Sequence, residues 1–212
     1  MPLLYLVRHG QTDWNAEHRL QGRADRPLNA TGQLQAAAVA QRLASEPLEA
    51  IYSSDLARAM ATAQAIAARH HLTVTPEPRL REISYGTWEG RTMAEIAQRY
   101  PSTLEAWRHG GYVPEEMGGE PEPAVASRVS ALLEELANRP SEERIALVSH
   151  GACLRVLIAL LAGGEAAARR PVVGTASLSR VLLTPSGARI LSLDERAHLE
   201  KVHAAEEAAA GA

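Results

Sequence analysis

Residues 3–12 of the chain are Leu-Leu-Tyr-Leu-Val-Arg-His-Gly-Gln-Thr. The first five form a continuous apolar run, which predicts a strand buried on both faces of a parallel or mixed sheet. Arg8 and His9 follow at its carboxyl end, where open α/β sheets bind their ligands. A guanidinium can hold phosphate oxygens and an imidazole can attack phosphorus, so the stretch predicts an anion site with a nucleophile. Taken alone, the pair would also fit a strand that simply reaches solvent.

The composition is that of a globular protein. Of 212 residues, 46% are hydrophobic and 22% are charged, which predicts one α/β domain over residues 1–195. The formal net charge of -3 provides no global attraction for nucleic acid. We expect no membrane partner, because no apolar stretch approaches the roughly 20 residues that span a bilayer. The N-terminus carries no signal-peptide pattern, so the expected location is the cytoplasm.

Cys153 is the single cysteine of the chain. One cysteine excludes an internal disulfide framework and a cysteine-rich zinc site. Its apolar surroundings favour a small core residue over a catalytic thiol. Neither a cluster of metal ligands nor a glycine-rich Walker loop is visible, so we predict no metal and no cofactor.

Strands alternate with helices along the chain, which predicts a three-layer α/β/α sandwich with a mostly parallel sheet. Strands are expected at 3–7, 50–53, 72–75 and 145–149, with a closing hairpin at 178–183 and 188–193. A helix is expected at 33–45, with Thr31 as its cap. A second helix should begin after a cap at Ser54 or Asp55 and run to about residue 70. Further helices are expected at 92–100, 124–137 and 151–161. Residues from about 100 to 123 are rich in Gly, Pro and acidic residues, which indicates a short lid or insertion. A helix-prone charged tail, frayed or disordered, is expected at 196–212.

Two further segments match the setting of Arg8 and His9. Arg58 follows a predicted strand and lies in the first turn of a helix, near free backbone N–H groups. An arginine there opposes the helix dipole unless an anion lies between them, although a solvated arginine is the alternative. His150 and Gly151 follow a second apolar run and begin a helix. One such histidine is usually structural, but two in matched positions indicate a shared site.

Candidate residues also occur in the loops. Glu82 precedes a glycine-containing loop, and a nearby phosphate would favour its protonated form, as a general acid requires. A surface glutamate is the alternative. Asn15, Gln21 and Gly22 lie in the loop after the first strand, where amide groups and exposed backbone can contact an anion.

Together these segments resemble the histidine phosphatase superfamily, with the phosphoglycerate-mutase-like fold, in its branch of small phosphatases. The resemblance covers about residues 3–183. The segments that carry it are Leu6 to Asn15 (LVRHGQTDWN), Arg19 to Gly22 (RLQG), Pro27 to Gly32 (PLNATG), Ser53 to Ala59 (SSDLARA) with Thr62 and Ala63, Leu80 to Glu82 (LRE), Gly86 to Gly90 (GTWEG) and Val148 to Gly151 (VSHG).

The resemblance implies a role for each core residue. His9 would be the nucleophile and become phosphorylated, while Arg8, Arg58 and His150 would bind the phosphoryl oxygens. Glu82 would protonate the leaving alkoxide and then activate water. The resemblance also places Asn15, Gln21, Gly22 and Gly151 at substrate-binding positions. Phosphoryl transfer depends mainly on positioning and charge neutralisation, which these side chains can supply without a metal.

Two departures from the family pattern are visible. Gly118-Gly119-Glu120-Pro121 replaces a common Gly-Glu-Ser, so a serine contact or helix cap is absent. Gly174-Thr175-Ala176-Ser177 lacks the asparagine often found before the late strand.

The expected activity is hydrolysis of a small phosphomonoester, such as a sugar phosphate or a phosphoglycerate derivative. The alternative is a cofactor-dependent phosphoglycerate mutase, whose relatives are longer and carry a basic cluster after the acid, where this chain has a short acidic lid. A binding module for phosphorylated ligands, without catalysis, is a second alternative. Strand edges or the final hairpin could support a homodimer.

Overall fold

The strand predicted at the start of the chain lies inside a mixed sheet with the strand order β3-β2-β4-β1-β5-β6. The computed structural model describes residues 1–109, 112–140, 142–163, 171–184, 187–202 and 204–205. The strands are β1 (Leu3–Arg8), β2 (Ala50–Ser53), β3 (Val74–Pro76), β4 (Arg144–Ser149), β5 (Leu178–Thr184) and β6 (Gly187–Glu195). β1 to β4 run parallel to one another, β5 is antiparallel to β1, and β6 is antiparallel to β5. The prediction of a mostly parallel sheet is therefore confirmed.

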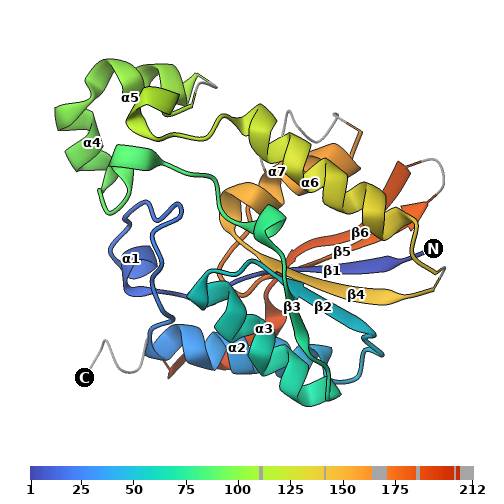
Figure 1. The fold of residues 1–212 in the computed structure, drawn as a ribbon. Coiled ribbons are helices and arrows are strands. Elements are labelled where there is room, and N and C mark those ends of the chain that lie inside the picture. The colour runs from blue at the N-terminus through green and yellow to red at the C-terminus, as the bar shows by residue number, and fades with distance from the viewer. Residues whose placement is uncertain (110–111, 141, 164–170, 185–186, 203, 206–212) are drawn as a thin grey trace.

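Helices cover both faces of this sheet, which gives the predicted three layers. The longer helices are α2 (Ala30–Leu43), α3 (Ala57–His70), α6 (Glu122–Ala137) and α7 (Gly151–Leu161). α2 and α3 cover one face, and α6 and α7 cover the other (Figure 1). One apolar cluster includes Val39, Ile66 and Val148, while a second includes Leu132, Leu147 and Leu157. Because both faces are covered, the interior of β1 is buried throughout, as its apolar run predicts.

No helix among the described residues is both long and apolar enough to cross a lipid bilayer.

Two predicted helix starts were wrong. α2 begins at Ala30 rather than at residue 33, because the Asn29 side chain, not Thr31, accepts the N–H of Gly32 at 2.8 Å. α3 begins at Ala57, and its N-cap residue, Leu56, makes no side-chain cap. The expected caps there have other partners: Asp55 pairs with Arg81, and Ser54 contacts a histidine described below.

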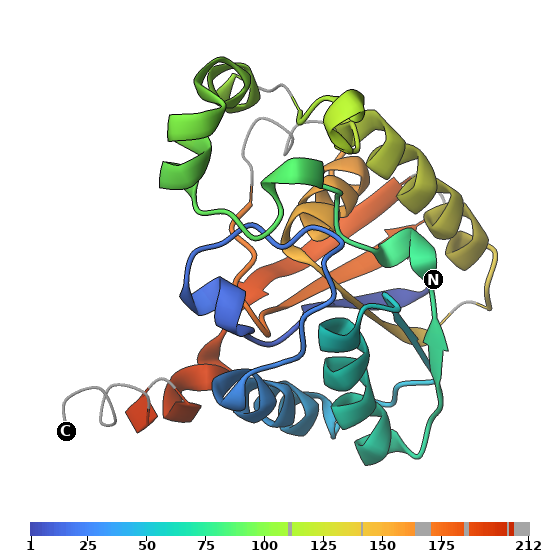
Figure 2. The ribbon, with the colours of Figure 1, turned by 60° about the vertical axis from the view of Figure 1, so that its left-hand side comes forward.

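The predicted lid contains regular structure rather than an irregular loop. α4 (Met93–Arg99) and α5 (Pro101–Arg108) lie outside the sheet layers, at the end of the molecule where β1 and β4 finish (Figures 1 and 2). A separate apolar cluster fixes this region: Tyr85, Trp88, Ile96, Leu104 and Val113. α1 (Asp13–Ala16) is a further short helix, within the predicted loop after β1. The loop segments also contain 3-10 turns at Pro78–Leu80, Gly86–Trp88 and Glu115–Met117.

The two strands of the closing hairpin are confirmed, and the turn predicted around Pro185 and Ser186 lies outside the described residues. The third strand is Val74–Pro76 rather than residues 72–75. The tail is packed at its start, because Ala197–Leu199 forms a 3-10 turn and both Leu199 and Val202 are buried. The prediction for residues 206–212 lies outside the described part of the chain.

We expect Leu147→Ala to lower the free energy of unfolding by about 3 kcal/mol, because it leaves a cavity in the middle of the sheet. Leu147 is fully buried in β4. Leu34→Ala in α2 is the control, since Leu34 is 55% exposed. Urea unfolding followed by circular dichroism measures both variants. Equal effects of the two substitutions would contradict the packing described here.

Candidate active site

The carboxyl ends of β1 and β4 meet at one point, and His9 lies there. Its backbone N–H donates to the Ser149 carbonyl at 3.0 Å, and its own carbonyl accepts from Ala176 at 3.1 Å. The Nδ1 atom of its ring is 2.6 Å from the Gly10 carbonyl, so Nδ1 carries the proton and donates it. Nε2 therefore keeps a lone pair, and Arg58 Nε donates to it at 3.3 Å. A buried neutral imidazole with an unprotonated Nε2 can act as a nucleophile once that long hydrogen bond gives way to a phosphoryl group.

Backbone carbonyls hold Arg58 in place. This fully buried side chain donates to the Gly22 carbonyl at 2.8 Å and to the Ala24 carbonyl at 2.9 Å. Gly22 has a φ of +54°, and a Cβ atom there would lie 2.1 Å from Glu89 Oε1, so the position requires glycine. The predicted anion-binding loop thus has an observed role: it orients the arginine beside His9.

Three of the predicted site residues have a buried polar atom that lacks a hydrogen-bond partner among the described residues. They are Arg8 Nε, His150 Nδ1 and Gln21 Oε1. Arg8 is anchored through Nη1 to the Val173 carbonyl at 2.6 Å, and His150 Nε2 contacts Ser54 Oγ at 2.8 Å. The two imidazole rings are 5.0 Å apart. Because an unpaired buried polar atom costs free energy, these groups fit a site that a polar ligand completes.

Burial and positive charge keep both histidines neutral. Burial is the largest cause that lowers the pKa of His9 well below 6.5, and the guanidinium groups of Arg58 and Arg8 add to it. The pKa of His150 is lowered well below 6.5 by burial first and then by the Arg58 charge. Burial also lowers the pKa of Arg58, to about 10, which leaves it charged near neutral pH. The site therefore combines a neutral imidazole with two cations.

The Glu82 side chain is buried against the first turn of α7. Its carboxylate accepts the N–H groups of Ala152 at 3.1 Å and Cys153 at 2.9 Å. The adjacent His150 is the N-cap residue of α7 and makes no side-chain cap, so Glu82 supplies partners for these free N–H groups. The charge of Glu82 also acts on Arg8 and Arg58. The predicted acid is thus placed beside the predicted anion-binding residues. Cys153 is buried and free, as expected of a core residue.

The other predicted binding residues lie around this centre in different ways. Gly151 begins α7 against Arg8, whose Cζ atom would be 3.4 Å from a Cβ at this position. Asn15 forms a capping box with Thr12 at the start of α1. The side-chain oxygen of Asn15 therefore already accepts the Thr12 N–H. Direct contacts of Asn15, Gln21, Gly22 and Gly151 with a substrate stay predictions.

The sequence analysis did not predict the roles of two residues that hold the side chains of the site in place. Ser54 was predicted as a helix cap, yet its hydroxyl contacts His150. Thr62 lies one turn after Arg58 in α3: its hydroxyl accepts the Gly10 N–H at 3.1 Å and donates to the Arg58 carbonyl at 2.9 Å. Both belong to the segments that resemble the family, so a signal was present. The missing cap noted in sequence is confirmed, because α6 begins after Pro121 without a side-chain cap.

A neutral, buried imidazole beside the charges of two arginines, at the strand ends of an α/β sandwich, is suited to phosphoryl transfer. Residues 4–196 match the histidine phosphatase superfamily, branch 1. The chain belongs to this superfamily.

The relatives include phosphatases and mutase-named proteins. A probable phosphoglycerate mutase of Photorhabdus laumondii is 41% identical over 186 residues, which cover 84% of this chain and 83% of that protein. Phosphoserine phosphatase 1 of Hydrogenobacter thermophilus is 37% identical, with 77% of each chain covered. The structure of a mycobacterial glucosyl-3-phosphoglycerate phosphatase matches with a TM-score of 0.83 and 32% identity, over 92% of this chain and 99% of that one. The prediction of a histidine-type phosphatase for small phosphoesters is confirmed at this level.

We expect Arg58→Met to raise the pKa of His9, because Arg58 is the nearest charge that disfavours the imidazolium ion. In the native protein the His9 ring should stay neutral as the pH falls through 6.5, whereas in the variant it should protonate at higher pH. Nitrogen-15 NMR titration of the imidazole measures both. Arg69→Met, an exposed position at the far end of α3, is the control and should leave the His9 titration unchanged. A His9 that titrates near 6.5 in the native protein would contradict the assigned electrostatics.

Proposed function

We propose that the protein hydrolyses small phosphomonoesters without a metal, through a phosphohistidine on Nε2 of His9. In the first half-reaction the Nε2–P bond forms while the P–O bond to the leaving alcohol breaks. Glu82 gives its proton to the departing oxygen. In the second half-reaction water attacks the phosphorus, Glu82 accepts a proton from that water, and the Nε2–P bond breaks to release inorganic phosphate.

One observation carries this proposal: the unprotonated Nε2 of the buried His9 ring lies beside Arg58, and the charge of Arg8 also acts on this ring. The transferring phosphoryl group spreads negative charge over its equatorial oxygens. The guanidinium groups of Arg8 and Arg58 and the unpartnered Nδ1 of His150 are suited to bind those oxygens. Gln21, whose buried amide oxygen also lacks a described partner, would bind beside them, with Asn15, Gly22 and Gly151 lining the pocket.

Hydrolysis is favoured over the mutase reaction by the region that covers the site. A phosphoglycerate mutase must hold a second phosphorylated acid over the phosphohistidine, which needs several cations. The described residues between α5 and α6 include Glu115, Glu116 and Glu120 but no lysine or arginine, and Glu122 follows as the first residue of α6. A mutase remains the second candidate, because relatives of this chain carry that name. A binding module without catalysis is disfavoured, since nucleophile, acid and arginines are all present together.

The expected location and partners of the protein stay predictions from sequence. They are a cytoplasmic location, no nucleic-acid or membrane partner, and a homodimer formed through strand edges or the final hairpin.

We expect His9→Ala to abolish both the phosphoenzyme and phosphate release. The test supplies phosphorus-32-labelled substrate, quenches the reaction in base, and looks for an alkali-stable, acid-labile phosphoryl group on the native protein. Phosphate release is measured in parallel with and without chelator. The control is His18→Asn, because His18 is exposed and has a φ of 54° that asparagine tolerates. Activity that is lost with chelator, or that survives in His9→Ala, would overturn the proposal.

We expect Glu82→Gln to slow hydrolysis of alkyl phosphates by about 10²–10⁴-fold, the usual contribution of a general acid. The loss with p-nitrophenyl phosphate should be much smaller, because its phenolate leaves without a proton. Glutamine keeps one oxygen to accept an N–H group from the start of α7, so the fold should persist, which a thermal melt checks. Equal losses on the two substrates would argue against Glu82 as the acid.

A further inference from the structure

Glu89 follows the 3-10 turn at Gly86–Trp88, and its carboxylate binds the turn at residues 22–24, whose carbonyls hold Arg58. Oε1 accepts the Arg23 N–H at 2.9 Å, and Oε2 accepts the Ala24 N–H at 2.9 Å. The side chain is half-buried and forms no ion pair with any residue that the structure describes. Both carboxylate oxygens are thus engaged by backbone N–H groups of one turn.

The peptide group between Gly22 and Arg23 connects Glu89 to Arg58. This peptide is trans, so its carbonyl and its N–H point to opposite sides. The carbonyl accepts from Arg58 Nη2 at 2.8 Å, while the N–H donates to Glu89. Because glycine adopts many backbone conformations, the peptide after Gly22 can rotate unless its N–H is held. Glu89 therefore keeps the carbonyl directed at the arginine.

A continuous series of hydrogen bonds runs from Glu89 to His9. Carboxylate, peptide, guanidinium and imidazole follow one another, since Arg58 also donates through Nε to His9 Nε2 at 3.3 Å. Groups joined in this way polarise one another and strengthen each bond. Burial lowers the pKa of Arg58 to about 10, and nearby carboxylates, Glu89 among them, act against this lowering. Glu89 thus favours both the position and the charge of Arg58.

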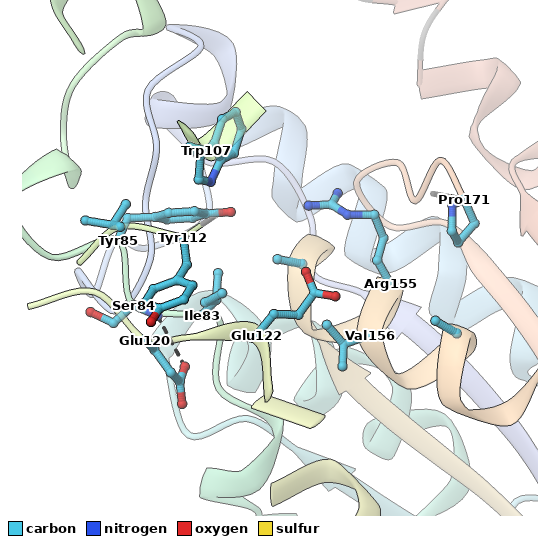
Figure 3. Close-up of a pocket in the computed structure, with 13 residues that line it drawn as sticks. Ile83, Ser84, Tyr85, Trp107, Tyr112, Glu120, Glu122, Arg155, Val156 and Pro171 are labelled. Carbon is cyan, nitrogen blue, oxygen red and sulfur yellow. Dashed lines mark hydrogen bonds between the residues drawn. The ribbon is translucent and has the colours of Figure 1, made fainter. Parts of the chain in front are cut away.

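Glu89 also reaches the segment that follows Glu82. Its Oε1 atom accepts the Tyr85 N–H at 3.1 Å. Tyr85 lines a cavity of about 160 Å³ beside α7, whose wall also includes Ala152, the backbone partner of Glu82 (Figure 3). One carboxylate therefore joins the turn that anchors Arg58 to the wall of the cavity beside the predicted acid.

Other contacts hold this region together without Glu89. Glu120, on the same cavity wall, accepts the Ser84 N–H at 3.3 Å and pairs with the Arg23 side chain at 2.9 Å (Figure 3). The Asp25 side chain accepts a backbone N–H at the start of α3 at 2.8 Å. Loss of the Glu89 carboxylate should therefore free the peptide after residue 22 while the turn stays attached to its neighbours.

We propose that Glu89 is a positioning residue, which holds Arg58 against Nε2 of His9 through the peptide group between Gly22 and Arg23. It acts on the reaction only through Arg58. This inference rests on the proposed function, in which His9 is the nucleophile.

The test is a nitrogen-15 NMR titration of the His9 ring in Glu89→Ala. Loss of a negative charge by itself would lower the pKa of His9 or leave it unchanged, whereas displacement of Arg58 would raise that pKa. We expect the pKa to rise, as in Arg58→Met. Glu89→Gln keeps one oxygen for the Arg23 N–H and should titrate closer to the native protein. The double variant Arg58→Met/Glu89→Ala should show no further rise over Arg58→Met, because Glu89 acts through Arg58.

Glu95→Ala is the matched control. Glu95 also accepts a backbone N–H, that of Thr92 at 2.7 Å, but it pairs with Arg19 instead of binding the turn at residues 22–24. Its loss should leave the His9 titration and the turnover of p-nitrophenyl phosphate unchanged. In Glu89→Ala, kcat on the same substrate should fall by up to about 100-fold, the loss expected when a reacting group is misplaced by about 1 Å.

The outcomes separate this inference from the proposed function. The inference would be overturned by a His9 pKa that falls or stays unchanged in Glu89→Ala, by an equal rise in Glu95→Ala, by a further rise in the double variant, or by an unchanged kcat in Glu89→Ala. In each case His9-dependent phosphate release by the native protein would leave the proposed function standing. A native protein that forms no phosphohistidine would overturn the proposed function, while the titration, which needs no turnover, would still decide whether Glu89 holds Arg58 against His9.

Discussion

The contact between Arg58 and the unprotonated Nε2 of His9 is the interaction on which the site depends. A buried guanidinium beside a buried imidazole is tolerated only while the imidazole is neutral, so the same pair fixes both the position and the protonation state of His9. Much of the surrounding structure holds this pair. The carbonyls of Gly22 and Ala24 bind Arg58, the Gly10 carbonyl binds Nδ1, and Thr62 links the two segments. The glycine required at position 22 follows from this contact.

The sequence predicted the sheet and the residues that meet at its strand ends because both depend on short-range patterns. The apolar run of β1 and the similar run before His150 are buried as expected, and their carboxyl ends bring the two histidines together. Helix starts were harder to predict, because several polar residues near each start can serve as a cap. Asn29 rather than Thr31 caps α2, and Ser54 binds His150 across the sheet instead of capping α3. Such partners come from distant parts of the chain, which local patterns do not reveal.

The lid illustrates the same limit. Its Gly, Pro and acidic residues correctly indicated an insertion, but α5 forms within it, and Leu104 of α5 packs in a small apolar cluster with Trp88. The cavity beside α7 gave no signal either, because its wall, which includes Ile83, Ala152 and Trp107, forms only when α7, the loop after Glu82 and the lid meet. Residues at strand ends are thus readable from sequence, whereas the cavity beside them is assembled by tertiary packing.

All three tryptophans of the chain occur in segments on the side of the molecule where the site opens. Trp14 is in α1 beneath Arg26, and Trp88 and Trp107 have ring centroids 6.1 Å apart where the lid packs on its own cluster. The sheet and the four helices that cover it contain none. Tryptophan fluorescence of this protein therefore reports on the loops and the lid around the site and not on the main core.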